Sequence, residues 1–162
     1  MAAEHGHTTL VDIMINSKFS LTSRDKLLRI PLHWAAIGGH DGSVDLLLKA
    51  GSDQFEKDTL GRTAFHYAAS GGKSSILILM ASKDPEIVHM TDDYGRTALH
   101  YAIFNKNSKQ VSIVRTLIEL KSDINAVDVD GKTALHHASE SAKSRVIPIL
   151  IQNGASLVKK AR

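Results

Sequence analysis

The chain has 162 residues, 43% of them hydrophobic, so it is long enough to bury a core. It carries a formal net charge of +3 and has no cysteine, which excludes disulfides, a thiolate zinc site and a thiol nucleophile. No apolar run approaches the roughly 18 residues of a membrane span, so we expect no membrane insertion. The start also lacks the basic and then apolar pattern of a secretory signal, so we expect an intracellular protein, cytoplasmic or nuclear.

A short phrase that ends in histidine recurs along the chain. Its four copies are Ile30-Pro31-Leu32-His33, Thr63-Ala64-Phe65-His66, Thr97-Ala98-Leu99-His100 and Thr133-Ala134-Leu135-His136, with steps of 33, 34 and 36 residues between the histidines. A fixed period of this size indicates one supersecondary unit stacked on itself. Such a stack presents an extended surface, so the repeat favours binding over catalysis.

Each phrase is followed by small residues, a glycine-rich break and then an apolar run. These predict a first short helix and an apolar second helix in every unit. The clearest second helices are residues 44–48, 76–80, 113–118 and 146–151, and residues 8–15 form a similar segment of an earlier unit. Runs this short could also be buried strands, and their constant place in the repeat favours helix.

The units resemble ankyrin repeats, whose pattern is met best by residues 33–40 and 58–63. The resemblance implies an all-α ankyrin-repeat solenoid of helix-turn-helix units with protruding β-turn fingers. It divides the chain into a half repeat or cap at 1–23, repeats at 24–57, 58–91 and 92–127, and a fourth repeat or cap at 128–162. Because the first unit is incomplete, we expect a piece of a longer array, and the alternative is a naturally shortened cap.

Several residues depart from the family pattern. Leu28 replaces a turn glycine and Ile30 replaces the threonine, so we expect an irregular finger in the first full repeat. Pro148 lies in an apparent second helix, where it is tolerated only in the first turn. Asp84 and Lys121 stand where the family prefers glycine after the second helix, and the third unit has extra residues between its helices.

The histidines and carboxylates do not indicate a metal, cofactor or catalytic site. The resemblance gives the repeat histidines hydrogen bonds to the backbone of a neighbouring finger. Equivalent residues of stacked repeats stand about 10 Å apart, whereas zinc ligands converge at bonds of about 2 Å. Carboxylates that recur with the repeat cannot form one asymmetric site. We therefore expect no metal, no cofactor and no enzyme activity.

A basic residue directly precedes each phrase, and an aspartate lies four residues before each of these basic residues. The basic residues are Arg29, Arg62, Arg96 and Lys132, and the aspartates are Asp25, Asp58, Asp92 and Asp128. Binding to a duplex needs roughly six to ten phosphate contacts, so a half-neutralised row of four predicts no nucleic-acid binding. The basic row is either a solvated finger edge or a patch for an acidic partner.

Apolar residues at variable positions are the candidate binding residues. By resemblance, Leu27, Leu60 and Tyr94 share one position at the finger tips, while Ile37 and Phe104 lie at the concave ends of first helices. Exposed apolar side chains of this kind serve as binding anchors. The alternative is that they are scattered surface hydrophobes. We add Arg62 and Arg96 to this candidate partner-binding set.

The residues directly after the repeat histidines are Trp34, Tyr67, Tyr101 and His137. They either fill the seam between repeats or offer one ring face to a ligand. Asn125, preceded by Leu117, Asp123 and Ile124, resembles the substrate pattern of ankyrin asparaginyl hydroxylases. It is therefore a candidate hydroxylation site, or simply a polar residue that closes a loop.

The sequence thus predicts a non-catalytic protein–protein interaction module that binds a partner protein or peptide on its concave face and finger tips. One alternative is the recognition or regulatory arm of a larger enzyme or channel. Another follows from the stretch through Lys18, Leu21 and Arg24 to His33-Trp34, which loosely resembles the start of ankyrin-type proteasome assembly chaperones. We expect a monomer, or weak self-association through the N-terminal end.

Overall fold

The structure is a computed structural model that describes residues 21–105 and 109–157. The described residues form four repeats, and each repeat contains a first helix and a second helix. The first helices are α2 (Pro31–Gly38), α4 (Ala64–Gly71), α6 (Ala98–Phe104) and α8 (Ala134–Glu140), and the second helices are α3 (Asp41–Lys49), α5 (Ser74–Lys83), α7 (Gln110–Glu119) and α9 (Ile147–Gln152). A 3-10 helix, η1 (Pro85–His89), follows α5. This part of the chain contains no strand.

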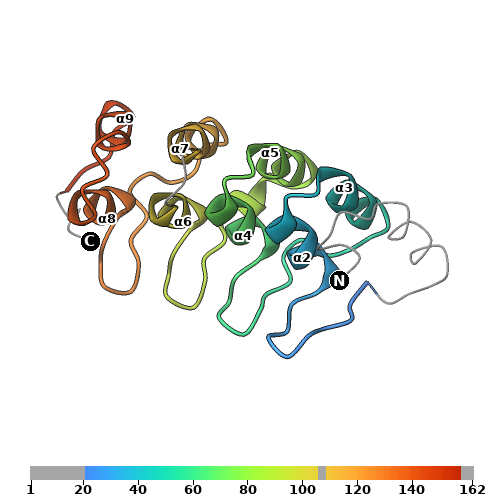
Figure 1. Ribbon diagram of the computed structural model, residues 1–162. Helices are drawn as coiled ribbons and strands as arrows, with labels where there is room; N and C mark the ends of the chain where they lie inside the picture. The colour runs from blue at the N-terminus through green and yellow to red at the C-terminus, as the bar shows by residue number, and fades with distance from the viewer. Residues whose placement is uncertain (1–20, 106–108, 158–162) are drawn as a thin grey trace.

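The helices form two rows in an elongated stack (Figure 1). The first helices make one row and the second helices make the other, while long turns extend from the side of the first helices. Neighbouring first helices contact one another in succession, from α2 to α8. The stack therefore confirms the predicted all-α solenoid of helix-turn-helix units with protruding turns.

Small side chains allow the first helices to approach closely. Alanines on this row are completely buried, namely Ala35, Ala36, Ala68, Ala69, Ala102 and Ala138. Larger apolar side chains fill the layer between the two rows, including Phe65, Leu77, Ile113 and Leu150. Full burial of such a side chain contributes about 1.5–3 kcal/mol, so this continuous strip is the main source of stability.

The second helices lie where the apolar runs predict them, with residues 44–48, 76–80 and 113–118 inside α3, α5 and α7. Pro148 falls in the first turn of α9, as expected, where its missing N–H leaves no hydrogen bond unmade. The predicted half repeat, its segment at 8–15 and the expected self-association through it lie almost wholly outside the described residues.

The expectation of an irregular first finger is wrong. Leu28 adopts the left-handed conformation with φ 59°, close to the φ of 74° at Gly61 in the next finger. Its N–H donates to the Asp25 carbonyl at 2.9 Å, as that of Gly61 donates to the Asp58 carbonyl at 3.1 Å. The finger keeps its shape because the leucine tolerates a conformation that costs an L-residue about 1–2 kcal/mol.

The other two departures from glycine differ from each other. Lys121 is left-handed, with φ 66°, and thus takes the conformation that the family glycine would have. Asp84 is extended instead, with φ −154°, and its side chain accepts the N–H of Glu86 at 3.0 Å. Asp84 therefore begins η1, so the chain leaves α5 by a different route.

Replacing Leu28 with glycine is expected to stabilise the protein. Leu28→Gly removes the left-handed strain, and the side chain is 45% exposed and loses little burial, so the free energy of unfolding should rise by about 1 kcal/mol. The adjacent Leu27, 43% exposed and without a positive φ, is the matched control. Leu27→Gly should lower the free energy of unfolding by about 0.5–1 kcal/mol. Urea unfolding measures both, and equal destabilisation would contradict this account.

Candidate functional site

Each finger is a five-residue turn held together by its first aspartate. The fingers are residues 25–29, 58–62, 92–96 and 128–132. In the second finger, Asp58 Oδ1 accepts the N–H groups of Leu60 at 2.8 Å and Arg62 at 2.9 Å, and the other fingers repeat this pattern. Burial would raise the pKa of Asp58, but hydrogen bonds from Arg62, Tyr67 and the backbone outweigh it and lower the pKa to about 2.

Backbone hydrogen bonds join the fingers at their tips. The N–H of Thr59 donates to the Leu27 carbonyl at 3.0 Å, and that of Asp93 donates to the Leu60 carbonyl at 3.1 Å. The N–H of Val129 continues the series to the Tyr94 carbonyl at 2.9 Å. The equivalent tip residues, which we call the tip row, are Leu27, Leu60, Tyr94 and Asp130. The row is thus one continuous, hydrogen-bonded edge.

The repeat histidines connect each first helix to the next finger. Nε2 of His33, His66 and His100 lies 3.2 Å from the carbonyl oxygen of Arg62, Arg96 and Lys132 respectively. On the other side of each ring, Nδ1 accepts a backbone N–H, as that of Thr63 donates to His66 at 3.1 Å. Each ring therefore carries its proton on Nε2 and donates it to the carbonyl, which confirms the role implied by the resemblance. Residues 21–105 and 109–157 contain no group of three or more His, Cys, Asp or Glu side chains that could hold a metal ion.

The residues directly after these histidines pack between neighbouring repeats. The Tyr67 hydroxyl donates to Asp58 Oδ2, and the Tyr101 hydroxyl donates to Asp92 Oδ2, both at 2.7 Å. Their rings pack edge-on against the preceding repeat histidine, at centroid distances of 5.9 and 5.4 Å. His137 makes both kinds of contact in the last repeat. These positions fit the packing interpretation.

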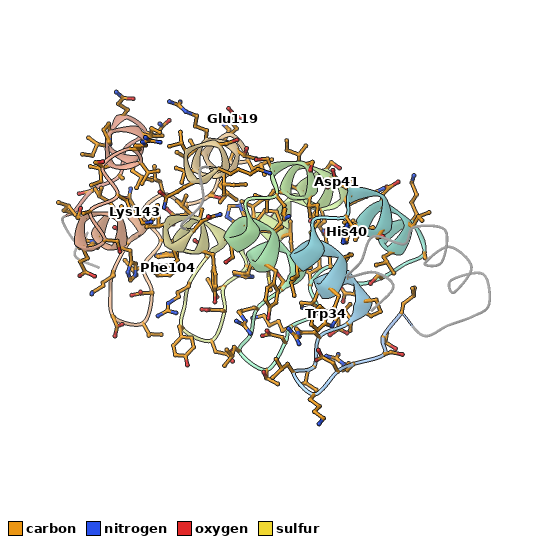
Figure 2. The ribbon with its side chains drawn as sticks, viewed as in Figure 1. Trp34, His40, Asp41, Phe104, Glu119 and Lys143 are labelled. Atoms are coloured by element: carbon orange, nitrogen blue, oxygen red, sulfur yellow. The ribbon has the colours of Figure 1, made fainter. Side chains whose placement is uncertain are left out.

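A second row of equivalent positions lies at the ends of the first helices. We call Ile37, Ser70, Phe104 and Glu140 the helix-end row. Phe104 lies on the finger side of α6, whereas Glu119 lies on the row of second helices (Figure 2). The Phe104 ring contacts Tyr101 at 6.4 Å and His137 at 5.0 Å between centroids. One side of Phe104 therefore belongs to the seam, and 37% of the residue remains exposed.

The predicted binding residues differ in how much they expose. Leu60 is 39% exposed and Tyr94 is 44% exposed, similar to Leu27, whereas Ile37 is partly buried. Arg62 is engaged within its own finger, since its guanidinium forms an ion pair with Asp58 at 2.7 Å. Of the predicted set, the structure thus leaves the tip residues and Phe104 as exposed apolar groups on the finger side.

Arg96 differs from the rest of the basic row. Arg29 pairs with Asp25 at 2.8 Å, and Lys132 pairs with Glu140 at 2.6 Å. Among the described residues Arg96 has no ion pair, and its guanidinium lies 4.9 Å from the Tyr94 ring centre and 5.6 Å from that of Phe104. The sequence treats the four basic residues as equivalent. The aromatic residues Tyr94, two positions before Arg96, and Phe104, eight positions after it, distinguish Arg96 from the other three in the sequence.

Asn125 closes a loop onto the last unit. Its side-chain Nδ2 donates to the Gly154 carbonyl at 3.0 Å, and its Oδ1 accepts the N–H of Ser156 at 2.9 Å. Both ends of the amide are thus engaged between neighbouring repeats. Hydroxylation at Asn125 stays a prediction.

The fold and the surface define a helical repeat scaffold. The sequence profile of the family described as ankyrin repeats (3 copies) matches residues 42–128 and 89–161, which together cover most of the chain. The chain therefore belongs to the ankyrin repeat family, whose members are generally protein–protein interaction modules and typically non-catalytic. Within the described residues, every helix is too short or too polar to cross a membrane.

The buried histidines make stability depend on pH. Burial lowers the pKa of His66 to about 4, despite the opposing effects of the Asp92 carboxylate and the Arg96 carbonyl, and burial also lowers the pKa of His33 and His100. A histidine in the unfolded chain has a pKa of about 6.5. At pH values between this pKa and the lower pKa of the folded protein, the unfolded chain therefore binds more protons than the folded protein. Stability therefore falls as pH falls through this window. His66 alone should lower the free energy of unfolding by about 2 kcal/mol between pH 7 and pH 5.

Urea unfolding at the two pH values measures this difference. The His66→Asn variant is the control, and its loss of stability between pH 7 and pH 5 should be smaller than that of the parent by about 2 kcal/mol. The finger carboxylate Asp58, with a pKa of about 2, titrates below this range. An identical pH dependence in the parent and the variant would contradict the assignment of a neutral, buried His66.

Proposed function

We propose that the chain is a protein-binding module whose partner, a protein or peptide, docks on the concave face. By concave face we mean the side formed by the tip row and the helix-end row. The observation that supports this most strongly is a series of exposed apolar side chains on that one side, at Leu27, Leu60, Tyr94 and Phe104. Aliphatic and aromatic groups of this kind, repeated along one edge, are typical of binding anchors.

The hydrogen bonds between tips support the proposal further. Each tip carbonyl of Leu27, Leu60 and Tyr94 is fixed by an N–H of the following finger. The anchors are therefore held at set spacings before any partner arrives, which lowers the entropic cost of binding. Arg62, neutralised by Asp58, contributes chiefly to the rate and salt dependence of association. Because family members are often intracellular, a cytoplasmic or nuclear partner belongs to the same proposal.

Alanine substitutions at the tips test the proposed face. Tyr94→Ala and Leu60→Ala should each raise the Kd of the partner about 30-fold, which corresponds to about 2 kcal/mol. Both residues lie at the surface, 39% and 44% exposed, so the free energy of unfolding should change by no more than about 0.5 kcal/mol. Phe104 also packs against Tyr101 and His137, so Phe104→Leu is the milder substitution there.

The measurement is a titration calorimetry series with a partner that is isolated by affinity capture and then purified. Ile78→Ala supplies the matched control, since Ile78 is an equally apolar residue, 53% exposed, on the second helix α5. It should keep full affinity. Loss of binding in Ile78→Ala, together with full affinity in Tyr94→Ala and Phe104→Leu, would place the partner on the other side of the stack.

A further inference from the structure

We propose that Arg96, held between Tyr94 and Phe104, binds a single aspartate or glutamate side chain of the partner, whose adjoining apolar residue packs on the two rings. We call these three residues the Arg96 cluster. This inference rests on the proposed function and adds the chemistry of the bound segment. It assigns the cluster a partner carboxylate as its missing counter-ion.

Three of the four basic residues already have a carboxylate from their own repeat. Arg29 and Arg62 pair with the first aspartate of their fingers, and Lys132 pairs with Glu140. Arg96 alone among these four has no ion pair to a described residue. Its Nε is in addition buried without a hydrogen-bond acceptor. Because the other three cations already have a carboxylate, this guanidinium is the group in the row that gains most from an acceptor supplied to its terminal N–H groups.

Arg96 is not paired with its own aspartate, although the equivalent residues of the second finger are paired. Asp92 Oδ1 accepts the N–H groups of Tyr94 and Arg96, and its Oδ2 accepts the Tyr101 hydroxyl. In the second finger the equivalent Asp58 Oδ2 accepts both Tyr67 and the Arg62 guanidinium. The equivalents of the two rings there are Leu60 and Ser70, which offer no aromatic face. Arg29 and Arg62 each lie over one ring, that of Trp34 at 4.0 Å and that of Tyr67 at 4.8 Å, and keep their ion pairs, whereas Arg96 lies near two rings and has no ion pair to a described residue.

The last repeat shows what a carboxylate does at this place. Glu140 occupies the position in the helix-end row that Phe104 occupies one repeat earlier. Its carboxylate lies 2.6 Å from Lys132 Nζ, so the basic residue and the helix end are close enough to share a carboxylate. In the third repeat that position supplies a ring and no charge. No carboxylate of residues 21–105 or 109–157 pairs with Arg96, so the proposal assigns one from another chain to this place.

The cluster fits one carboxylate with an apolar neighbour better than a run of acids. A guanidinium that stacks on aromatic rings keeps its in-plane N–H groups for a bidentate carboxylate. Tyr94 is 44% exposed and Phe104 is 37% exposed, which leaves ring surface for an apolar side chain. Asp93 and Asp130 are exposed at this tip and the next, and they disfavour further negative charge.

The test is a selection of random twelve-residue peptides displayed on phage against three proteins. The parent and the Arg29→Gln variant, whose arginine is already paired with Asp25, should enrich peptides with Asp or Glu beside an aromatic or aliphatic residue. The Arg96→Gln variant should lose the acidic preference. Within one selected peptide, replacing the acidic residue with its amide should weaken binding to the parent about tenfold and leave binding to Arg96→Gln unchanged. If Arg96→Gln folds poorly, the same peptide pair is measured on the parent and on Arg29→Gln, where the amide should weaken binding by the same factor, and a smaller effect on Arg29→Gln would contradict the assignment to Arg96.

Three results would overturn the inference in different ways. Peptides that lose affinity for Tyr94→Ala, yet show no acidic preference or lose it equally in Arg29→Gln, would refute the carboxylate site and leave the proposed face intact. Selected peptides that bind Tyr94→Ala and Phe104→Leu as well as the parent would refute both the carboxylate site and the proposed face. A selection that enriches no peptide would also count against both.

Discussion

The buried hydrogen bond from a repeat histidine to the next finger is the interaction on which this molecule depends. The Arg62 carbonyl accepts the Nε2 proton of His33 and also the N–H of Asp58, so one oxygen joins the first repeat to the turn of the second. The same arrangement recurs at Arg96 and Lys132. Because the imidazoles are nearly completely buried, these bonds lie in a low-dielectric environment where an unpaired group would be costly.

That bond also fixes the surface. The residue whose carbonyl it holds is the basic residue of the finger, so its Cα has a set position between the tip row and the helix-end row. The side chain then depends on its immediate neighbours, which differ from repeat to repeat. Arg62 keeps its ion pair with Asp58 while its guanidinium also lies 4.8 Å from the Tyr67 ring centre, whereas Arg96 lies near the rings of Tyr94 and Phe104 and has no ion pair to a described residue. A regular scaffold thereby carries a local difference that a partner can recognise.

Much of this could be predicted from the sequence because the repeat multiplies weak signals. Short apolar runs that are ambiguous alone become helices once they share one position in four units. Three of the runs lie within α3, α5 and α7, and α9 begins one residue into the fourth, at Ile147. The first finger was mispredicted because a single strained residue costs little. Leu28 adopts the glycine conformation at a cost of about 1–2 kcal/mol, and the cooperative bonds of the turn outweigh it.

The site was less predictable for a different reason. Equivalent positions suggested four equivalent basic residues, whereas the pairing of each depends on side chains that lie close only in the folded stack. Phe104 illustrates the same limit, since its distance of 5.0 Å from His137 places part of the ring in the seam between repeats. Single-residue surface predictions therefore need the packing of both neighbouring repeats.

The most direct test of the account compares the same substitution at an inner and an outer histidine. His66 donates to the Arg96 carbonyl, whereas His136 Nε2 has no partner among the described residues, although both accept a threonine N–H through Nδ1. Substitution by asparagine retains an acceptor for that N–H and removes the link to the next finger. We expect His66→Asn to lower the free energy of unfolding at pH 7.5 by about 2 kcal/mol or more, and His136→Asn by about 0.5 kcal/mol or less. Equal losses at the two positions would contradict the claim that this hydrogen bond couples the repeats.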